Sequence, residues 1–273
     1  MTKGLYIAHS GMVNEQHRLD VAANNVANYA TNGYKKEGTT SQTFKDVFDF
    51  KVKDMSYANG HLHQYIGEMQ PGVKIGENYV DYSEGPIKET GNPYDLALTD
   101  KGFFAIEFAS KSGGTSVKYT RDGNFTLTQD GELTTQEGDF VLDVNGNHIK
   151  LNTLTDSVIE RDGTIIQNDA VVAKIGIYDF QNYDKIERYG ENYFQPIAQP
   201  IDGSEPEEAF VANNNPGGTQ IFAGYLETSN VSVVDEMVSL ITIQRQYESN
   251  QKMIQTVDET LEPVVNNLGR VSG

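Results

Sequence analysis

The sequence predicts an α+β fold in which helices at the two ends of the chain enclose a β-rich middle. Near each end, apolar side chains recur every seven residues, which places them along one seam of a helix. Between the ends, short apolar runs alternate with Asp-Gly and Asn-Gly pairs, the strongest short-range signal for β-hairpins. We therefore expect the two terminal helices to form a coiled-coil-like inner domain, with a central β-rich domain of hairpins.

The N-terminal helix is expected to run from about Gly4 to Asn28. Its seam consists of Leu5, Met12, Leu19 and Val26, with Ala8 and Ala22 at intermediate positions. The run Thr31-Asn32-Gly33-Tyr34 should end the helix, because Asn and Gly readily adopt the left-handed conformation. Near this end, Asn24, Asn25 and Asn28 either mark fraying or hydrogen-bond to a neighbouring chain. Residues 1–35 are thus assigned to the inner domain.

The C-terminal helix should begin near Asn230 and continue to about Glu262, with a kink or restart at Pro263, which lacks a backbone donor. Its seam consists of Val233, Leu240, Tyr247, Ile254, Leu261 and Leu268. If this series occupies heptad position d, the a positions are Met237, Gln244, Gln251, Asp258 and Val265. The three polar residues in that row would weaken a simple two-stranded coiled coil, and Ile241, Val257 and Val264 widen the apolar surface. Such a broad, partly polar stripe suits a helix that is contacted from several sides. The alternative is an ordinary amphipathic helix lying on its own β-domain. Residues 226–273 are assigned to this part of the inner domain.

The middle of the chain divides into two segments. Residues 36–72 have the mixed charge and weak periodicity of an irregular, extended connecting arm. Residues 73–225 form the predicted central β-rich domain, whose turns should lie at Asp122-Gly123, Asp130-Gly131, Glu137-Gly138, Asn145-Gly146 and Asp162-Gly163. Both Asp-Gly and Asn-Gly tolerate positive φ, which tight hairpins require. The proline-rich stretch 195–218 should be a return loop.

The charge and composition exclude several classes of partner. The chain has 39 acidic and 21 basic residues, a net charge of −18, so nucleic acid phosphates and anionic lipid should repel it. It has no cysteine, and hence no disulfide or thiolate metal site. The first residues lack the apolar run of a secretory signal peptide, and no apolar span approaches the roughly 18 residues of a transmembrane helix. We expect no nucleic acid partner and no direct membrane insertion.

No pattern in the sequence indicates catalysis or a cofactor. His61 and His63 alternate on a possible strand, with Glu68 nearby, but a recognisable third ligand is missing. The run Asp143-Val144-Asn145-Gly146-Asn147 resembles part of a calcium loop, yet the twelfth position is Leu154 instead of Glu. A tight turn explains it better. Nucleophile-elbow, dinucleotide and P-loop motifs are absent. We expect no catalytic, cofactor-binding or metal-binding residues.

Three groups of motifs resemble bacterial flagellar basal-body rod and hook proteins. The first is Ser10-Gly11-Met12, Leu19-Asp20, Ala23-Asn24-Asn25-Val26-Ala27-Asn28 and Thr31-Asn32-Gly33-Tyr34-Lys35. The second is Thr90-Gly91-Asn92-Pro93-Tyr94-Asp95-Leu96-Ala97, Gly102-Phe103-Phe104 and Tyr119-Thr120-Arg121-Asp122-Gly123-Asn124-Phe125. The third is Gly224-Tyr225-Leu226-Glu227-Thr228-Ser229-Asn230-Val231, Glu236-Met237 and Gln244-Arg245-Gln246-Tyr247-Glu248. The resemblance covers nearly the whole chain in the expected order.

This resemblance implies a structural subunit of the flagellar basal-body rod that transmits torque and has neither catalysis nor a cofactor. In the family, both terminal helices pack in the inner tube of an axial structure, and the β-domain forms the outer layer. Export through the flagellar type III apparatus and assembly with copies of itself and with other rod and hook proteins are implied. The seam residues and Met237 would then contact neighbouring subunits. A distal-rod type is favoured, with a proximal-rod or hook-family protein as the alternative. A secreted binding module or hydrolase is the competing class.

Overall fold

The chain divides into two compact units in a computed structural model, which describes residues 2–45, 47–53, 62–109, 113–198, 206–212 and 218–268. Unit 1 consists of Met1–Val26, Glu37–Val80 and Val233–Gly273, and unit 2 consists of Ala27–Lys36 and Asp81–Ser232. The fold is α+β, as the sequence predicts. None of the helices in the described ranges is long and apolar enough to cross a membrane.

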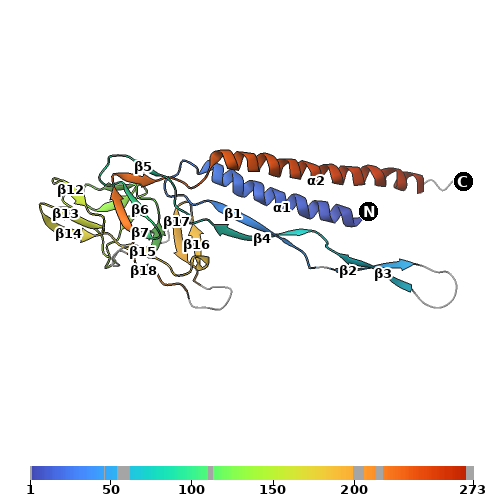
Figure 1. The fold of residues 1–273 in the computed structure, drawn as a ribbon, viewed down its shortest axis with the longest axis horizontal. Coiled ribbons are helices and arrows are strands. Elements are labelled where there is room, and N and C mark those ends of the chain that lie inside the picture. Colours follow the sequence, from blue (N-terminus) through green and yellow to red (C-terminus); the bar gives the residue numbers. More distant parts are fainter. Residues whose placement is uncertain are drawn as a thin grey trace. The chain divides into compact units, whose positions relative to one another are not determined.

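Unit 1 contains the two long helices, α1 (Thr2–Ala27) and α2 (Val233–Leu268), which lie side by side and antiparallel in Figure 1. Arg18 Nη1 donates to Gln246 Oε1 over 3.3 Å. One turn of α1 lies especially close to α2, because a Cβ at Gly11 would be 3.0 Å from Asn250 Nδ2. A small residue at this position therefore allows the helices to approach each other.

The second packing row of α2 differs from the prediction. Glu236 and Ile243 are each 4% exposed, and Asn250 and Val257 are half-buried. In the single chain Met237, Gln244, Gln251 and Asp258 of the predicted row are all exposed. A contact between this row and neighbouring subunits stays a prediction. A series with a period of seven fits heptad position a as well as d, and the two choices place the second row on opposite sides of the seam. Burial shows that the Val233 series occupies a.

The observed ends of both helices can be compared with the predicted ones. Helix α1 ends at Ala27, close to the predicted position, whereas α2 continues through Pro263 instead of breaking there. Proline removes one backbone donor, and the surrounding hydrogen bonds can still maintain the helix. Near the end of α1, Asn25 is 1% exposed; its amide donates to Glu37 O over 2.8 Å and accepts from Glu37 N over 3.0 Å. Asn25 therefore bonds within its own chain.

A two-stranded ribbon completes unit 1 where the sequence indicated an irregular arm. The strands are β1 (Glu37–Thr43), β2 (Val47–Lys53), β3 (Leu62–Met69) and β4 (Val73–Val80), and β1 pairs with β4 as β2 pairs with β3. Helix α1 lies between this ribbon and α2 (Figure 1). Asn14 Nδ2 donates to Ser41 Oγ over 3.0 Å, and Val73 N donates to Ser10 Oγ over 3.3 Å. Polar contacts of this kind join the ribbon to α1.

Unit 2 is built on a nine-stranded antiparallel sheet. Its main order is β16 (Ile186–Tyr189), β17 (Tyr193–Pro196), β8 (Thr115–Thr120), β7 (Phe103–Ala109), β11 (Phe140–Val141), β10 (Leu133–Thr135) and β9 (Phe125–Leu127). In addition, β15 (Ile177–Asp179) pairs with β7 and with β18 (Phe210–Val211). The smaller sheets are β12 (Ser157–Ile159), β13 (Thr164–Gln167) and β14 (Ala170–Lys174); β6 (Leu96–Thr99) with β19 (Gln220–Ala223); and β5 (Ile87–Glu89) with β20 (Tyr225–Glu227).

The core of unit 2 lies between these sheets, and the predicted turns frame it. Phe104 and Phe125 are fully buried, with ring centroids 5.1 Å apart in an edge-to-face arrangement. The glycines of four predicted turns have the positive φ that tight hairpins require: Gly131, Gly138, Gly146 and Gly163. Gly123 is different, because a Cβ there would overlap the Leu96 carbonyl oxygen. Within the predicted return loop 195–218, the described residues include β18.

Candidate functional site

The predicted seam residues occupy the paired helices of unit 1. The half-buried members are Leu5, Met12, Leu19, Val26, Val233, Leu240, Tyr247, Ile254 and Leu261. The side chain of Leu268 lies outside the described ones. Half-burial in a single chain leaves part of each of these side chains accessible, so the seam is neither a closed core nor a free surface.

A second apolar row runs along the exposed face of α2. Val234, Met237, Val238 and Ile241 are 50–71% exposed, and their spacing places them on one side of the helix. The heptad pattern had assigned Met237 to a packing row, whereas the structure groups it with these exposed residues. We call these four residues the α2 stripe. Contiguous exposed apolar side chains are typical of interaction surfaces.

In unit 2, the segment Thr31–Lys36 is held closely by residues from distant parts of the sequence. Gly33 N donates to Glu227 O over 2.8 Å. Gly33 has φ +66°, and a Cβ there would lie 2.5 Å from the Arg121 carbonyl carbon. The glycine that the sequence marked as a helix stop therefore has a second purpose, which is close backbone contact with the turn after β8.

Tyr34 is the apolar anchor of this segment. Its side chain is 1% exposed, and the Arg188 guanidinium carbon lies 4.3 Å from the ring centroid. Arg188 Nη2 also donates to Lys35 O, which fixes the guanidinium beside the ring. A cation over an aromatic face in a desolvated position adds electrostatic attraction to the burial of the ring.

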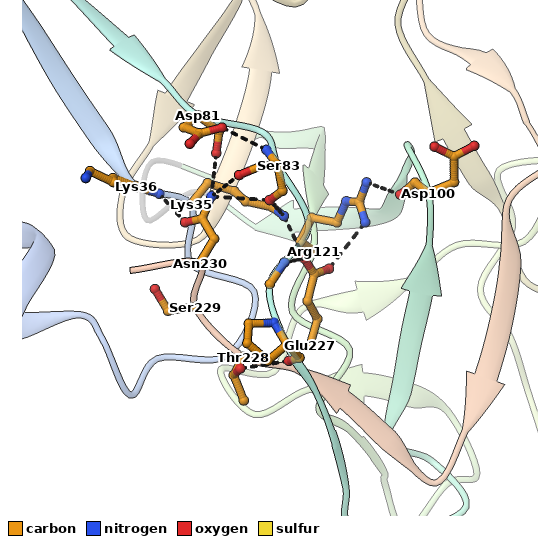
Figure 2. A network of polar contacts seen from close by, with 12 residues as sticks. Lys35, Lys36, Asp81, Ser83, Asp100, Arg121, Glu227, Thr228, Ser229 and Asn230 are labelled. Carbon is orange, nitrogen blue, oxygen red and sulfur yellow. Dashed lines mark hydrogen bonds and ion pairs between the residues drawn. The ribbon is translucent and has the colours of Figure 1, made fainter. Parts of the chain in front are cut away.

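Next to Tyr34, a buried ion network joins three distant segments of the chain, as Figure 2 shows. Lys35 Nζ lies 2.6 Å from Glu227 Oε1 and donates to Ser83 O over 2.7 Å. Arg121 Nη1 lies 3.2 Å from Glu227 Oε2, and Arg121 Nη2 donates to Asp100 O over 2.6 Å. We call Lys35, Arg121 and Glu227 the junction triad.

The junction triad is almost fully desolvated, and its charges do not balance. Each side chain is 1–2% exposed, and two cations share one carboxylate. Burial lowers the pKa of Lys35, while the charge of Glu227 opposes that effect. Buried charges that are paired and hydrogen-bonded specify one geometry more than they add net stability. The network therefore holds the segments that carry these three side chains in place.

A separate group of carboxylates surrounds the Tyr193 hydroxyl. That oxygen lies 2.9 Å from both Glu137 Oε2 and Asp139 Oδ2, although a hydroxyl has only one hydrogen to donate. The pKa of nearby Asp122 is raised to about 6, chiefly by burial and to a smaller extent by the charge of Glu137. Across the residues that the structure describes, no group of three or more His, Cys, Asp or Glu side chains is arranged to hold a metal.

Of the two metal-site candidates in the sequence, the structure describes the side chains of only the calcium-like run. His61 lies outside the described residues, and so do the side chains of His63 and Glu68. The calcium-like run is a turn, as predicted: Asp143 Oδ1 accepts from Asn145 N over 2.7 Å and from Asn147 N over 2.9 Å. The carboxylate that a calcium ion would need is thus used by the backbone of its own turn.

Three family models match the chain, in the order in which the sequence presents its motifs. Residues 5–35 match "Flagella basal body rod protein", residues 97–167 match "Flagellar hook protein FlgE/F/G D1 domain", and residues 223–268 match "Flagellar basal body rod FlgEFG protein C-terminal". The first and last matches contain Lys35 and Glu227, so the two ends of the junction triad lie in matched segments.

The relatives that match the whole chain are named either FlgG or FlgF. The chain is 35% identical to the flagellar basal-body rod protein FlgG of Bacillus subtilis, over 97% of this chain and 99% of the relative. It is 31% identical to the flagellar basal-body rod protein FlgF of Mesorhizobium japonicum and 32% identical to that of Caulobacter vibrioides, over 100% of both chains in each case. Similarity to both kinds of rod protein extends from end to end.

Proposed function

This chain belongs to the FlgF/FlgG family of flagellar basal-body rod proteins, and we propose that it polymerises through its terminal helices into the axial structure. It is a structural, non-enzymatic protein of the flagellar basal body, and it assembles with other rod subunits. The observation that carries the proposed mode of assembly is the α2 stripe. Four apolar side chains stay exposed on a helix whose other face is packed.

In this mode of assembly each face of α2 has its own partner. The seam row from Val233 to Leu261 packs with α1 and leaves its half-exposed edges for neighbouring subunits. The α2 stripe meets helices of adjacent subunits directly. The seam residues of α1, from Leu5 to Val26, likewise pack with α2 and leave their half-exposed edges for neighbouring subunits. A rod subunit built like this forms a tube in which every helix is contacted from several sides.

We also propose specific partners and a position in the rod for this chain. Copies of this chain, neighbouring rod proteins and the hook protein are its partners in the axial structure, and the flagellar type III apparatus exports it. The distal-rod position is favoured over the proximal one, because its highest identity among the quoted relatives is to a FlgG. In this position the chain transmits torque to the hook.

The test places a charge on the α2 stripe. A charge at Val238 would be buried in each intersubunit contact, at a cost of several kcal/mol if unpaired. We expect cells with Val238→Asp to export the protein, to lack completed rods and to be non-motile, while the purified monomer melts as the wild type does. Ser239→Asp is the matched control, because Ser239 is also exposed on α2 but lies on a different side of the helix from the stripe. Normal rods with Val238→Asp would refute this mode of assembly.

A further inference from the structure

We propose that Asn230 is a positioning residue that ties together the chain connections through which unit 2 joins the helical part of the rod protein. The inference rests on the proposed function, since it assumes a subunit that carries mechanical load. The side chain sits where the connections converge, and the contacts that support this assignment all lie within unit 2 (Figure 2).

The chain passes between the two units at four places, after residues 26, 36, 80 and 232. Asn230 Oδ1 accepts from Lys36 N over 2.7 Å, at the second of these crossings. Asn230 Nδ2 donates to Asp81 O over 2.9 Å, at the third crossing. Asn230 itself lies two residues before Ser232, where the fourth begins. One side chain therefore links three of the four connections.

Further bonds make this a cluster instead of a single contact. Asp81 N donates to Lys36 O over 2.8 Å, so the second and third connections are also bonded to each other. Asn230 Nδ2 lies 3.2 Å from Ser83 O and 3.1 Å from Ser83 Oγ. Thr228 N and Oγ1 both donate to Pro86 O, over 2.9 and 2.7 Å. Residues 227–230 thus form a spine between the segments 33–36 and 81–86.

The chemistry of the position calls for an amide. The Lys36 contact needs an acceptor, whereas the Asp81 and Ser83 carbonyls need donors. Asparagine presents both on one short side chain. Aspartate would keep the acceptor, lose both donors and place a negative charge against two carbonyl oxygens. Alanine would remove both functions.

The mechanical consequence follows from where the bonds are. Any load that passes along the chain between the units passes through the four connections. Single connections that are free of one another can bend and twist independently, whereas bonded connections move as one piece. Asn230 is half-buried, so its bonds link connections without forming part of the apolar core of unit 2. The bonds of Asn230 therefore stiffen the chain connections between the units more than they stabilise unit 2.

The first experiment measures hydrogen exchange in the purified full chain. Asn230→Ala should accelerate exchange of the Lys36 amide by roughly fivefold, as expected for the loss of one hydrogen bond, with little change in melting temperature. Asn230→Asp should leave the Lys36 amide protected, because aspartate keeps the acceptor that this N–H needs. Asn145→Ala is the control, because it removes an exposed asparagine from a turn of the same unit. Equal exchange at Lys36 in wild type and Asn230→Ala would overturn the assignment.

The second experiment measures swimming speed at increasing viscosity. Cells with Asn230→Ala should export the protein and complete their rods, yet lose speed more steeply than wild type as viscous load rises. Speeds that match the wild type at every viscosity would overturn the mechanical role. The proposed mode of assembly is tested separately, because its failure would appear as normal rods in cells with Val238→Asp. Neither of the two experiments on Asn230 uses that variant.

Discussion

At the residue scale, Glu227 joins several distant segments of unit 2. Its carboxylate accepts from Gly85 N and pairs with two buried cations, while its carbonyl accepts from Gly33 N. The residues it joins come from three parts of the chain. The loss of this single side chain would therefore leave several groups without partners at once.

We expect Glu227→Ala to destabilise unit 2 by about 3–5 kcal/mol, because Lys35 and Arg121 would remain buried as unpaired cations. Denaturant unfolding of the full chain measures this loss. Glu208→Ala is the control, since Glu208 is an exposed carboxylate of the same unit. A change within about 1 kcal/mol of the control would show that the junction triad has no part in stability.

Asp122 provides a prediction about pH. Its pKa is raised to about 6 in the folded chain, chiefly by burial, against about 3.9 when unfolded. The ionised form therefore costs stability at neutral pH, and this cost disappears as the pH falls through 6 toward 4. Asp122→Asn removes the charge but retains an acceptor for Asn124 N.

We expect Asp122→Asn to be more stable than wild type at about pH 7.5, by roughly 1–2 kcal/mol, and the difference to vanish at about pH 4.5. Denaturant unfolding of both chains at the two pH values measures it. Comparing the two chains cancels the titration of the other carboxylates. A stability difference that grows as the pH falls would contradict the raised pKa.

At the scale of elements, the boundaries of the β-domain differ from the predicted 73–225. The segments Ala27–Lys36 and 226–232 belong to unit 2, and they carry Lys35 and Glu227. A fragment of residues 73–225 would therefore lack two members of the junction triad. It would leave Arg121 buried without its carboxylate and would also lose the Tyr34 anchor.

A fragment of residues 27–232 should consequently melt at a higher temperature than one of residues 73–225. Both fragments contain the complete nine-stranded sheet. Thermal unfolding followed by circular dichroism makes the comparison. The replacement Lys35→Ala in the longer fragment should remove part of the difference. Equal melting temperatures would mean that the segment Ala27–Lys36 contributes nothing to the stability of unit 2.

At the scale of the whole molecule, assembly must overcome a net charge of −18 on every copy. Like-charged subunits repel each other, and salt shortens the range of that repulsion. Apolar contacts such as those of the α2 stripe do not weaken as salt is added. We therefore expect purified protein to assemble more readily as the salt concentration rises from about 10 to about 150 mM.

Sedimentation of the purified chain over this range of salt checks the expectation. The Val238→Asp variant carries nearly the same net charge and should stay unassembled throughout. This contrast separates screening of the overall charge from the apolar contact itself. Assembly that declines as salt is added would show that ion pairs, not apolar contacts, join the subunits.

The sequence by itself determined what depends on local pattern. Seven-residue spacing identified both terminal helices, because side chains at that interval fall on one face of a helix whatever surrounds it. Asp-Gly and Asn-Gly pairs located the hairpin turns at Gly131, Gly146 and Gly163, and a Glu-Gly pair located the one at Gly138, because the required positive φ is a property of the turn alone. Motifs spread along the chain indicated the family, and with it a structural, non-enzymatic protein of the basal body.

Only the tertiary structure decided which residues from distant segments meet. Nothing local distinguished Glu236 from Met237 as a packing position, since the seam fits two heptad phases and burial alone separates them. Lys35 and Glu227 are 192 residues apart, and Arg121 and Glu227 are 106 apart. Each looks like an ordinary surface charge in the sequence. Their burial follows from strand pairing that brings three distant segments together, and no periodicity along the chain records that arrangement.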